Sequence, residues 1–548
     1  MDRITKIWAA AHKPATDEVV ADLPIVEGAL PDDLSGVLYR NGPGRFAIGE
    51  DTYNHFFDGD GMILRFAIGA KSSDSRPRVR YRNAWVRTRE LLAESLAGRM
   101  LYRGFGTNLP GGIAENFLRL RFKNAANTSV VYHPVAEARS KTRPKGSSSP
   151  DLSPTDGKLL ALWEGGLPHL LDPTTLATIE RADFDGGLQN RGRWLDRLLA
   201  PELPFSAHPK RDLETGDLYN FGVTSGPSPQ LLLYKLDAQG RFSTLRQLAL
   251  PHFAFVHDFC LTAHYFVFFI CPVRFDEKGI LLGLSTLAGS LQGLSKEGVP
   301  TRVLLVPRDG GGPIWQETSP CFVFHLANAY EDENGQVHVD GCRQPEYPAF
   351  PPIPDVLAGR IDVFPRAAMT RYTIDPKAPA GTRIKEEVIG DHSSELPTIA
   401  PGFSGRPHRY IWAVGPSRPE NGQPRHHNIT TSVVRHDTLT KTSVIHDFSE
   451  GDTPGLPGEP IFVRRTGGAP SETDGYILTV VYHGPIEKDG ANGAQTGGDS
   501  QRSNRSALHV LDASDLSTIC VALLPHHIPP GFHGTFVPAE ACPAGWQT

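Results

Sequence analysis

Four histidines lie in similar surroundings although the chain separates them widely. They are His208 in FSAHPK, His257 in FAFVHDF, His325 in CFVFHLANAYED and His533 in PPGFHGTFVP. Each stands near the end of a predicted strand, among aromatic, small or proline residues. Four neutral imidazoles that meet at one point would bind Zn, Cu, Fe or Ni, and without thiolate or carboxylate ligands they do not identify the metal. Any one of them alone is more typical of a hydrogen-bonded core histidine, so the metal hypothesis depends on the set.

Three glutamates are embedded in apolar predicted strands. They are Glu164 in LLALWEGGLPHLL, Glu395 in SSELPTIAP and Glu459 in GLPGEPIFV. A histidine that binds a metal through one ring nitrogen usually donates the N–H of the other to a carboxylate or a carbonyl. Isolated acids of this kind are therefore candidate partners of the histidines, and a position at an exposed strand edge is the alternative for each.

The elements that would position these residues are short strands. The chain has 55 glycines and 47 prolines, and they separate β-branched and aromatic runs such as RYIWAVG and HYFVFFICPV, which predicts an all-β fold. A strand, an aspartate, a turn and a second strand recur five times, around Asp172, Asp237, Asp375, Asp437 and Asp512. Such a hairpin cannot bury its apolar face alone, so the repetition favours a β-propeller over chance recurrence of a common hairpin. Its innermost strands converge on the axis, where remote histidines could meet.

Helical patterns are few. They cover residues 88–100, 193–200 and 279–296, and the last is nearly uncharged. That segment is compatible with a core or cap helix and with a surface that dips into a bilayer. Two polar stretches, 137–157 and 488–505, are predicted to be surface loops between blades. Neither is a domain boundary, so we expect a single domain over residues 1–548.

Composition excludes some classes of protein. The formal net charge of -6 with no basic run gives no surface for nucleic acid. The six cysteines are far apart and form no CxxC pair, which is typical of reduced thiols. No stretch reaches the roughly 18 uninterrupted apolar residues of a membrane-spanning helix. We therefore expect a soluble cytoplasmic protein.

Further motifs extend the pattern over nearly the whole chain. They are LSGVLYRNGPGRF (34–46), HFFDGDGMILRF (55–66), MLYRGFG (100–106), FKNAANTSVVYH (122–133), LALWEGGLPHLLDPTTLATI (160–179), LLVPRDGGG (304–312), GRPHRYIWAVG (405–415) and GEPIFVRR (458–465). With the four histidine segments, they resemble the carotenoid cleavage oxygenases, and particularly the apocarotenoid oxygenases.

The resemblance implies a seven-bladed β-propeller with a cap of loops and short helices. It implies a ferrous, non-haem iron on the axis and cleavage of a conjugated C=C bond by O₂, which gives aldehydes similar to retinal. By the same resemblance His208, His257, His325 and His533 match the iron ligands. Glu164, Glu395 and Glu459 match the carboxylate partners of His257, His325 and His533 respectively, and His208 is left without one.

A long polyene substrate needs an apolar tunnel, for which Trp163 and Leu396 are candidate lining residues. The resemblance also favours the bilayer interpretation of 279–296, with the protein lying on the membrane and not spanning it. A stilbenoid oxygenase, in which Tyr102 and Lys123 would engage a phenol, is the alternative within the family. A retinoid isomerase and a propeller without catalysis are the others. The sequence leaves the oligomeric state open.

Overall fold

The structure is a computed structural model, and all statements about it refer to the residues that it describes. These are residues 3–547 except 72–76, 136–156, 193, 195–196, 198–199, 227, 294–297, 349, 359, 361–365, 421–425, 427–428, 451–452, 468–470, 486–501 and 544.

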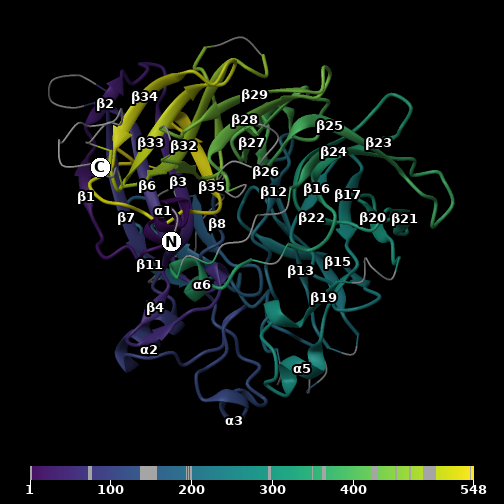
Figure 1. Cartoon of the computed structure of the whole chain (residues 1–548). Helices are drawn as coiled ribbons and strands as arrows, with labels where there is room; N and C mark the ends of the chain where they lie inside the picture. The colour runs from purple at the N-terminus through teal and green to yellow at the C-terminus, as the bar shows by residue number, and fades with distance from the viewer. Residues whose placement is uncertain are drawn as a thin grey trace, which may run out of the picture.

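Seven antiparallel sheets in the described part of the chain form the blades of a propeller (Figure 1). Blade 1 contains β1 (Val20–Asp22), β3 (Gly36–Arg45), β6 (Asp60–Lys71), β7 (Pro77–Trp85) and β35 (Gly534–Pro538). Blade 2 contains β8 (Ser129–His133), β9 (Lys158–Leu162), β10 (His169–Leu171) and β11 (Thr178–Arg181). Blade 3 contains β12 (Lys210–Arg211), β13 (Leu218–Val223), β14 (Gln230–Leu236) and β15 (Phe242–Ala249). Blade 4 contains β16 (Phe259–Leu261), β17 (Tyr265–Ile270), β20 (Thr301–Pro307) and β21 (Ile314–Thr318).

The second half of the chain supplies the other blades. Blade 5 contains β22 (Phe322–Glu331), β23 (Val337–Gln344), β24 (Ala368–Ile374) and β25 (Lys385–Ser393). Blade 6 contains β26 (Glu395–Thr398), β27 (Tyr410–Gly415), β28 (Ser432–Asp437) and β29 (Thr442–Asp447). Blade 7 contains β2 (Ile25–Gly28), β30 (Gly455–Pro457), β31 (Ile461–Arg464), β32 (Gly475–His483), β33 (Arg505–Asp512) and β34 (Thr518–Leu523). Two small sheets lie outside the blades and pair β4 (Ala47–Ile48) with β5 (Asp51–Thr52) and β18 (Val273–Phe275) with β19 (Leu291–Gly293).

Segments from both ends of the chain close the ring. Strand β35 pairs with β3 in blade 1, where Val537 lies opposite Val37. Strand β2 pairs with β34 in blade 7, where Gly28 lies opposite Cys520. In Figure 1 the purple and yellow strands accordingly lie side by side. Blades 1 and 7 are thus each built from early and late residues, so the ring cannot open without breaking a sheet.

The five aspartates of the repeated hairpin lie at the turns that lead into the last strand of a blade in chain order. Each carboxylate accepts hydrogen bonds from backbone N–H groups of the turn, as Asp172 does from Thr174 at 3.0 Å and Asp512 from Ser514 at 2.8 Å. The others do so at Gln239, Lys377 and Leu439. An aspartate that hydrogen-bonds its own turn favours that turn over a continued strand. The repeat therefore marks the outer hairpins of blades, and the propeller prediction is confirmed.

Short helices and loops form a cap on one side of the ring. They are α1 (Arg3–Ala11), α2 (Arg89–Ala97), α3 (Gly112–Asn116), α5 (Glu277–Leu281), α6 (Ile353–Leu357) and the 3-10 turns η1 (Phe56–Asp58) and η2 (Ala288–Ser290). Two further 3-10 turns lie outside the cap: η4 (Pro401–Phe403) contacts Asn328 of blade 5, and η6 (Ala539–Ala541) contacts Ser35 before blade 1. Helix α2 confirms the pattern over 88–100. Thr88 caps it by accepting a hydrogen bond from the Leu91 N–H at 3.0 Å, and Gly98 ends it at φ 65°.

The prediction of one helix over 279–296 is wrong. Helix α5 ends at Leu281, and the chain continues through η2 into β19. Gly283 follows α5 at φ 71°, a left-handed conformation that ends a helix, and further glycines in the stretch lower its helix propensity. The pattern over 193–200 and the predicted loops at 137–157 and 488–505 fall largely outside the described residues.

Two observations bear on redox state and membrane topology. All six cysteines are free. Within the described residues, no helix has the length and apolar character needed to cross a bilayer. The assignment of the whole chain to one domain stays a prediction.

Candidate metal centre

The structure brings the four predicted histidines together at the inner edges of four blades. His208 and His257 stand just before β12 and β16, His325 lies in β22, and His533 directly precedes β35. One ring nitrogen of each lies within 4.8 Å of the corresponding nitrogens of the other three. These residues are far apart in sequence, so the convergence comes from the ring of blades and not from any local motif.

The three predicted glutamates come from the three remaining blades. The Nδ1 of His257 lies 3.0 Å from Glu164 Oε2, that of His325 lies 2.7 Å from Glu395 Oε2, and that of His533 lies 2.8 Å from Glu459 Oε1. Glu164 follows β9, Glu395 begins β26, and Glu459 lies between β30 and β31. No carboxylate pairs with His208 among the described residues.

This arrangement leaves lone pairs pointing at one another in a buried space. We assign the proton of each paired imidazole to Nδ1, because Nδ1 faces a carboxylate, and Nε2 is then an acceptor. The Nε2 of His325 is buried without a hydrogen-bond partner, and the Nε2 atoms of His208 and His257 are 2.9 Å apart. Buried acceptors without donors are costly unless a cation lies between them. The spread of 4.8 Å is a little more than twice a metal–nitrogen bond of about 2.1 Å, so the donor set fits a metal ion.

Burial controls the protonation of the cluster. It lowers the pKa of His208 well below its usual range, and it lowers that of His533 to about 4 although the Glu459 carboxylate opposes the change. At His257 burial also disfavours the charged form, but the carboxylates of Glu164, Asp258 and Glu395 together outweigh burial and the pKa is raised. Neutral imidazole is the form that binds metals. Burial therefore keeps His208 and His533 in their metal-binding form at neutral pH.

Two of the three carboxylates are themselves held in place. Glu459 Oε2 accepts hydrogen bonds from Arg40 Nη1 at 2.7 Å and from the Gly534 N–H at 2.9 Å. Glu395 Oε1 accepts one from Gln344 Nε2 at 2.9 Å. Sequence reasoning did not predict Arg40 or Gln344. The signal for Arg40 is a charged residue in the middle of the glycine-rich run GVLYRNGPGR, where it is buried.

A second position that the sequence did not reveal is Asp258, the residue after His257. Its Oδ2 accepts a hydrogen bond from the Leu326 N–H at 2.9 Å, directly after His325. Its Oδ1 accepts one from the Phe259 N–H at 2.8 Å. Asp258 therefore ties the strand that carries His257 to the strand that carries His325.

A cavity of about 2450 Å³ leads to the histidines. Its lining includes His257, His325 and His533 and the aromatic residues Phe57, Phe105, Phe255, Phe324, Phe350 and Phe532. Rings of this set lie close together, with 5.4 Å between the centroids of Phe57 and Phe350 and 5.2 Å between those of Phe324 and His257. Such a wall favours an apolar, extended ligand.

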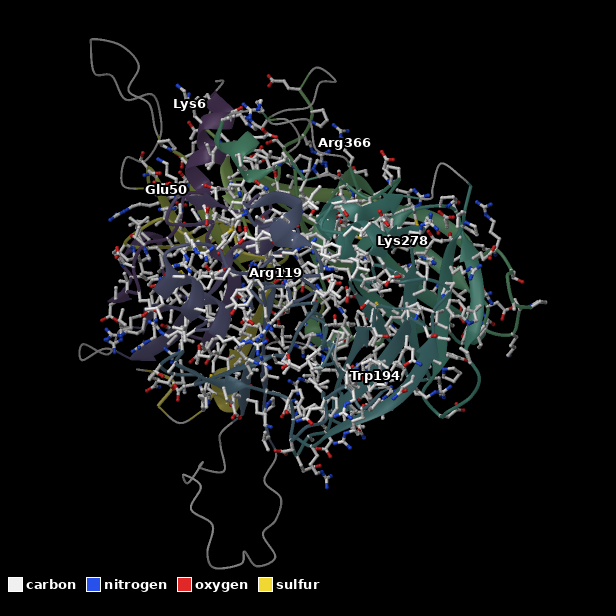
Figure 2. All side chains as sticks on the ribbon, turned by 90° about the horizontal axis from the view of Figure 1, so that it is seen from below. Lys6, Glu50, Arg119, Trp194, Lys278 and Arg366 are labelled. Atoms are coloured by element: carbon white, nitrogen blue, oxygen red, sulfur yellow. The ribbon has the colours of Figure 1, made fainter. Side chains whose placement is uncertain are left out.

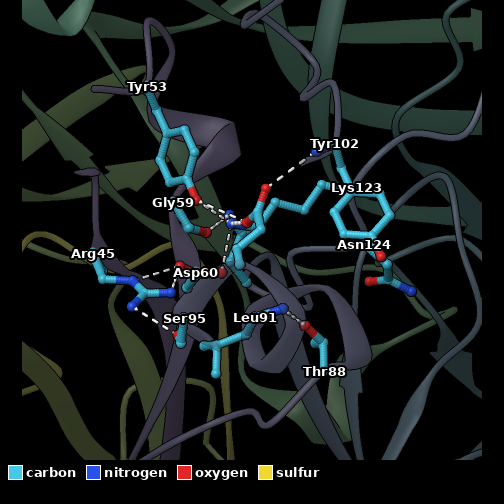
Figure 3. A network of polar contacts seen from close by, with 12 residues as sticks. Arg45, Tyr53, Gly59, Asp60, Thr88, Leu91, Ser95, Tyr102, Lys123 and Asn124 are labelled. Carbon is cyan, nitrogen blue, oxygen red and sulfur yellow. Dashed lines mark hydrogen bonds and ion pairs between the residues drawn. The ribbon is translucent and has the colours of Figure 1, made fainter. Parts of the chain in front are cut away.

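The four predicted substrate contacts lie in different places. Trp163, Leu396 and Tyr102 line the cavity, and Leu396 has a left-handed backbone at φ 52° beside Glu395. Lys123 is instead buried in the network of Figure 3, where its Nζ lies 2.6 Å from Asp60 Oδ1 and 3.0 Å from Glu94 Oε2. It also donates to the hydroxyl of Tyr53. Only 1% of the Lys123 side chain is exposed, and it is not part of the cavity wall in the described structure.

The propeller, the axial histidines and the apolar cavity define the class of protein. The family model of retinal pigment epithelial membrane protein, RPE65, matches residues 12–538, and the chain belongs to this family of carotenoid oxygenases. The chain is 33% identical over 538 residues to apocarotenoid-15,15'-oxygenase of Synechocystis sp., with 96% of each chain covered. It is 26% identical to lignostilbene-alpha,beta-dioxygenase isozyme III of Sphingomonas paucimobilis, with 94% of each covered.

A solved structure supports the same assignment. Cobalt-substituted apocarotenoid oxygenase of Synechocystis has a TM-score of 0.78 to this chain at 32% identity, covering 98% of this chain and 99% of the other. The predicted resemblance and the seven-bladed propeller are thus confirmed.

Proposed function

We propose that this oxygenase binds ferrous iron through His208, His257, His325 and His533 and cleaves an internal C=C bond of an apocarotenoid. One molecule of O₂ is consumed, the double bond is broken, and each of its carbons becomes a carbonyl, so that no external reductant is needed. The observation that carries the proposal is the cluster of four histidine nitrogens within 4.8 Å at the inner end of an aromatic cavity.

The choice of metal combines the donor set with the resemblance. Four imidazoles suit several first-row metals. Because these ligands are neutral, the bound ion keeps its full positive charge. When bound, ferrous iron supplies the activation of O₂ that a closed-shell alkene requires. The three glutamates accept the Nδ1–H bonds and so fix the tautomer and the ring orientation of three ligands.

The cavity residues bind and position the substrate. The aromatic wall excludes water and holds a flat polyene by contact with ring faces and edges, so that one double bond lies beside the histidines. No charged side chain is required at the reacting bond, because a hydrocarbon chain offers no polar group to recognise. The position that the substrate chain takes along the cavity therefore decides which double bond lies beside the histidines and is cleaved.

An apocarotenoid is favoured over a phenolic stilbene by the position of Lys123. Its ammonium is engaged by Asp60 and Glu94, and moving it toward the cavity would leave two buried carboxylates without their cation. Tyr102 does line the cavity and is available to a phenol. A stilbene therefore remains the comparison substrate in the test.

We also propose that the protein docks on a membrane surface through its cap, consistent with a peripheral, cytoplasmic location. The cap patch consists of the exposed residues Ile113, Phe117, Leu118, Leu281, Leu282 and Leu284. Its two halves are joined by a hydrogen bond of 3.0 Å from the Leu118 N–H to the Leu281 carbonyl. Leu118 and Leu281 also line the cavity, so the patch surrounds a mouth through which a lipid-soluble substrate could enter.

Cations flank this patch. Arg119, Arg121 and Lys278 are exposed beside it. In Figure 1 helices α3 and α5 project from the same lower side of the molecule, and Figure 2 views that side with Arg119 near the centre and Lys278 beside it. An apolar surface with a cationic rim suits a bilayer that contains anionic lipids.

The test of the catalytic proposal compares two substrates. Iron-loaded protein is incubated under O₂ with an apocarotenal and, separately, with a hydroxystilbene, and the aldehydes are identified by mass. We expect cleavage of the apocarotenal. Products from the stilbene alone would assign the other substrate class, and no product from either with iron bound would refute the dioxygenase assignment.

The metal assignment has a separate test in His325→Ala. We expect this variant to lose bound iron after dialysis, as measured by metal analysis, because the cluster then has only three of its nitrogens. His264→Ala, at an exposed histidine that pairs with Glu331 on blade 5, is the matched control. Equal iron content in His325→Ala and the wild type would show that His325 is not a ligand.

A further inference from the structure

We propose that helix α1 forms the end wall of the substrate cavity on one side of the histidines, and that Trp8 sets how far the substrate chain can extend on that side. This inference rests on the proposed polyene cleavage. Trp8 and His12 line the same cavity as His257, His325 and His533. They come from a helix that belongs to no blade.

Two ring contacts, linked by residues adjacent in sequence, connect α1 with the metal centre. The indole of Trp8 stacks on Phe56 with 6.0 Å between centroids and 16° between planes. Phe57, the next residue, packs edge-on against Phe532 at 5.5 Å. Phe532 precedes His533, so the wall that begins at Trp8 ends at a histidine of the metal centre.

The orientation of Trp8 is fixed within its own helix. Its Nε1 donates a hydrogen bond to His12 Nε2 at 3.2 Å, and His12 Nδ1 lies 2.8 Å from the Trp8 carbonyl oxygen. Residues four apart share one face of a helix, so both rings are presented together. Burial lowers the pKa of His12 to about 4, which keeps it neutral and able to accept from the indole. The indole N–H is thereby satisfied and an apolar ring surface is left for the cavity.

The buried side of α1 packs on blade 7 and on the segment between β27 and β28. Ile7 and Ala11 are buried against Ile429, Leu456 and Tyr482. Ile429 and Leu456 also line the cavity. The helix therefore forms a part of the cavity wall that blade 7 does not supply.

Cavity size indicates why this wall matters for substrate length. A volume of about 2450 Å³ exceeds the about 300–1,000 Å³ of common ligand pockets, and the lining runs from Trp8 on α1 to Leu118 and Leu281 at the cap patch. Leu118 and Leu281 at the cap patch lie at the open side. A chain cleaved at an internal bond must extend past the metal in both directions, and on the α1 side it meets Trp8. The distance from the metal to Trp8 then limits that part of the substrate.

The experiment shortens this side chain and varies the ligand. Trp8→Ala and Trp8→Leu are compared with the wild type and with Trp194→Ala, which removes an exposed tryptophan. Dissociation constants for apocarotenals of increasing chain length are measured from the shift in polyene absorbance, and kcat/KM is measured for the same series. We expect Trp8→Ala to improve binding of the longest members relative to the shortest by about 10-fold, a difference of about 1.4 kcal/mol, with Trp8→Leu intermediate and Trp194→Ala unchanged.

The outcomes separate this inference from the proposed function. If the wild type binds and cleaves polyenes but its chain-length profile is the same in both Trp8 variants, Trp8 does not set the length and the inference is wrong. If the wild type neither binds nor cleaves any polyene, the proposed function is wrong. Should Trp8→Ala fail to fold, Trp8→Leu, which keeps apolar contact with Phe56, decides the question.

Discussion

The ammonium of Lys210 and the carboxylate of Asp258 lie 2.8 Å apart, and each stands beside a histidine of the metal centre. Lys210 is two residues after His208, and Asp258 directly follows His257. Burial lowers the pKa of Lys210, but the surrounding groups, with Asp258 first among them, together outweigh burial and the pKa is raised. Because Asp258 also accepts the Leu326 N–H, one carboxylate joins the strands of His208, His257 and His325.

We therefore expect Asp258→Asn to weaken metal binding without removing a ligand. The amide cannot match the charge of Lys210, so the three strands lose their common anchor. A loss of about 10-fold in metal affinity is expected, as for other residues that position ligands. It is measured by competition with a chelator. Asp375→Asn, at an outer turn where an amide can still accept the turn N–H, is the control. If Asp258→Asn and Asp375→Asn bind the metal with equal affinity, Asp258 does not position the ligands.

Glu459→Gln is expected to reduce metal affinity by about 10 to 100-fold. The Glu459 carboxylate accepts from His533, from Arg40 and from the Gly534 N–H. In glutamine one of the two positions becomes a donor, which then faces another donor, and the buried Arg40 loses its counter-charge. Metal content and thermal stability should therefore fall together. Glu214→Gln, at an exposed turn, should change neither metal content nor thermal stability. Normal metal affinity in Glu459→Gln would show that Glu459 does not support His533 as a ligand.

The histidines could be predicted because each carries a signature within its own segment. An imidazole among aromatic, small or proline residues near a strand end is visible in a short window, and so are the aspartates that form the outer turns. Gln344 and Asp258 carry no such signature, and the charge of Arg40 is visible in its own segment but its partner is not, because these roles arise only when blades meet. Arg40 and Glu459, for example, are 419 positions apart and belong to blades 1 and 7.

The length of the cap helix could not be read from apolarity. The segment 279–296 is rich in leucine, which suggests a helix, but Gly283 adopts a left-handed backbone that divides it. Leu281, Leu282 and Leu284 of this segment are exposed, and contact of the segment with a bilayer stays a prediction. Their neighbour α3 was missed, because five residues are too few for a periodic pattern, and its contact with α5 is tertiary.

Gly534→Ala tests how closely blade 1 holds His533. A Cβ at this position would lie 2.3 Å from the Tyr39 carbonyl oxygen and 2.6 Å from Arg40 Cδ, so backbone would have to move. We expect a loss of about 1–3 kcal/mol in stability, typical of overpacking, and reduced metal retention because His533 is adjacent. Thermal melts and metal analysis measure both. Gly312→Ala, where a Cβ meets open space, should be neutral. Full metal retention in Gly534→Ala would mean that His533 tolerates this displacement.

The cap patch predicts membrane binding that depends on two helices far apart in sequence. Phe117→Asp with Leu284→Asp should weaken binding to vesicles containing anionic lipid by at least about 10-fold, because burial of each large apolar side chain contributes about 1.5–3 kcal/mol. Cosedimentation measures the bound fraction. Leu439→Asp, at an exposed outer turn of blade 6, is the control. Added salt should weaken the wild type through Arg119, Arg121 and Lys278 without abolishing binding, since the apolar contribution is not screened. Vesicle binding that survives the double substitution would place the docking surface elsewhere, and the mouth at Leu118 and Leu281 would then open to water.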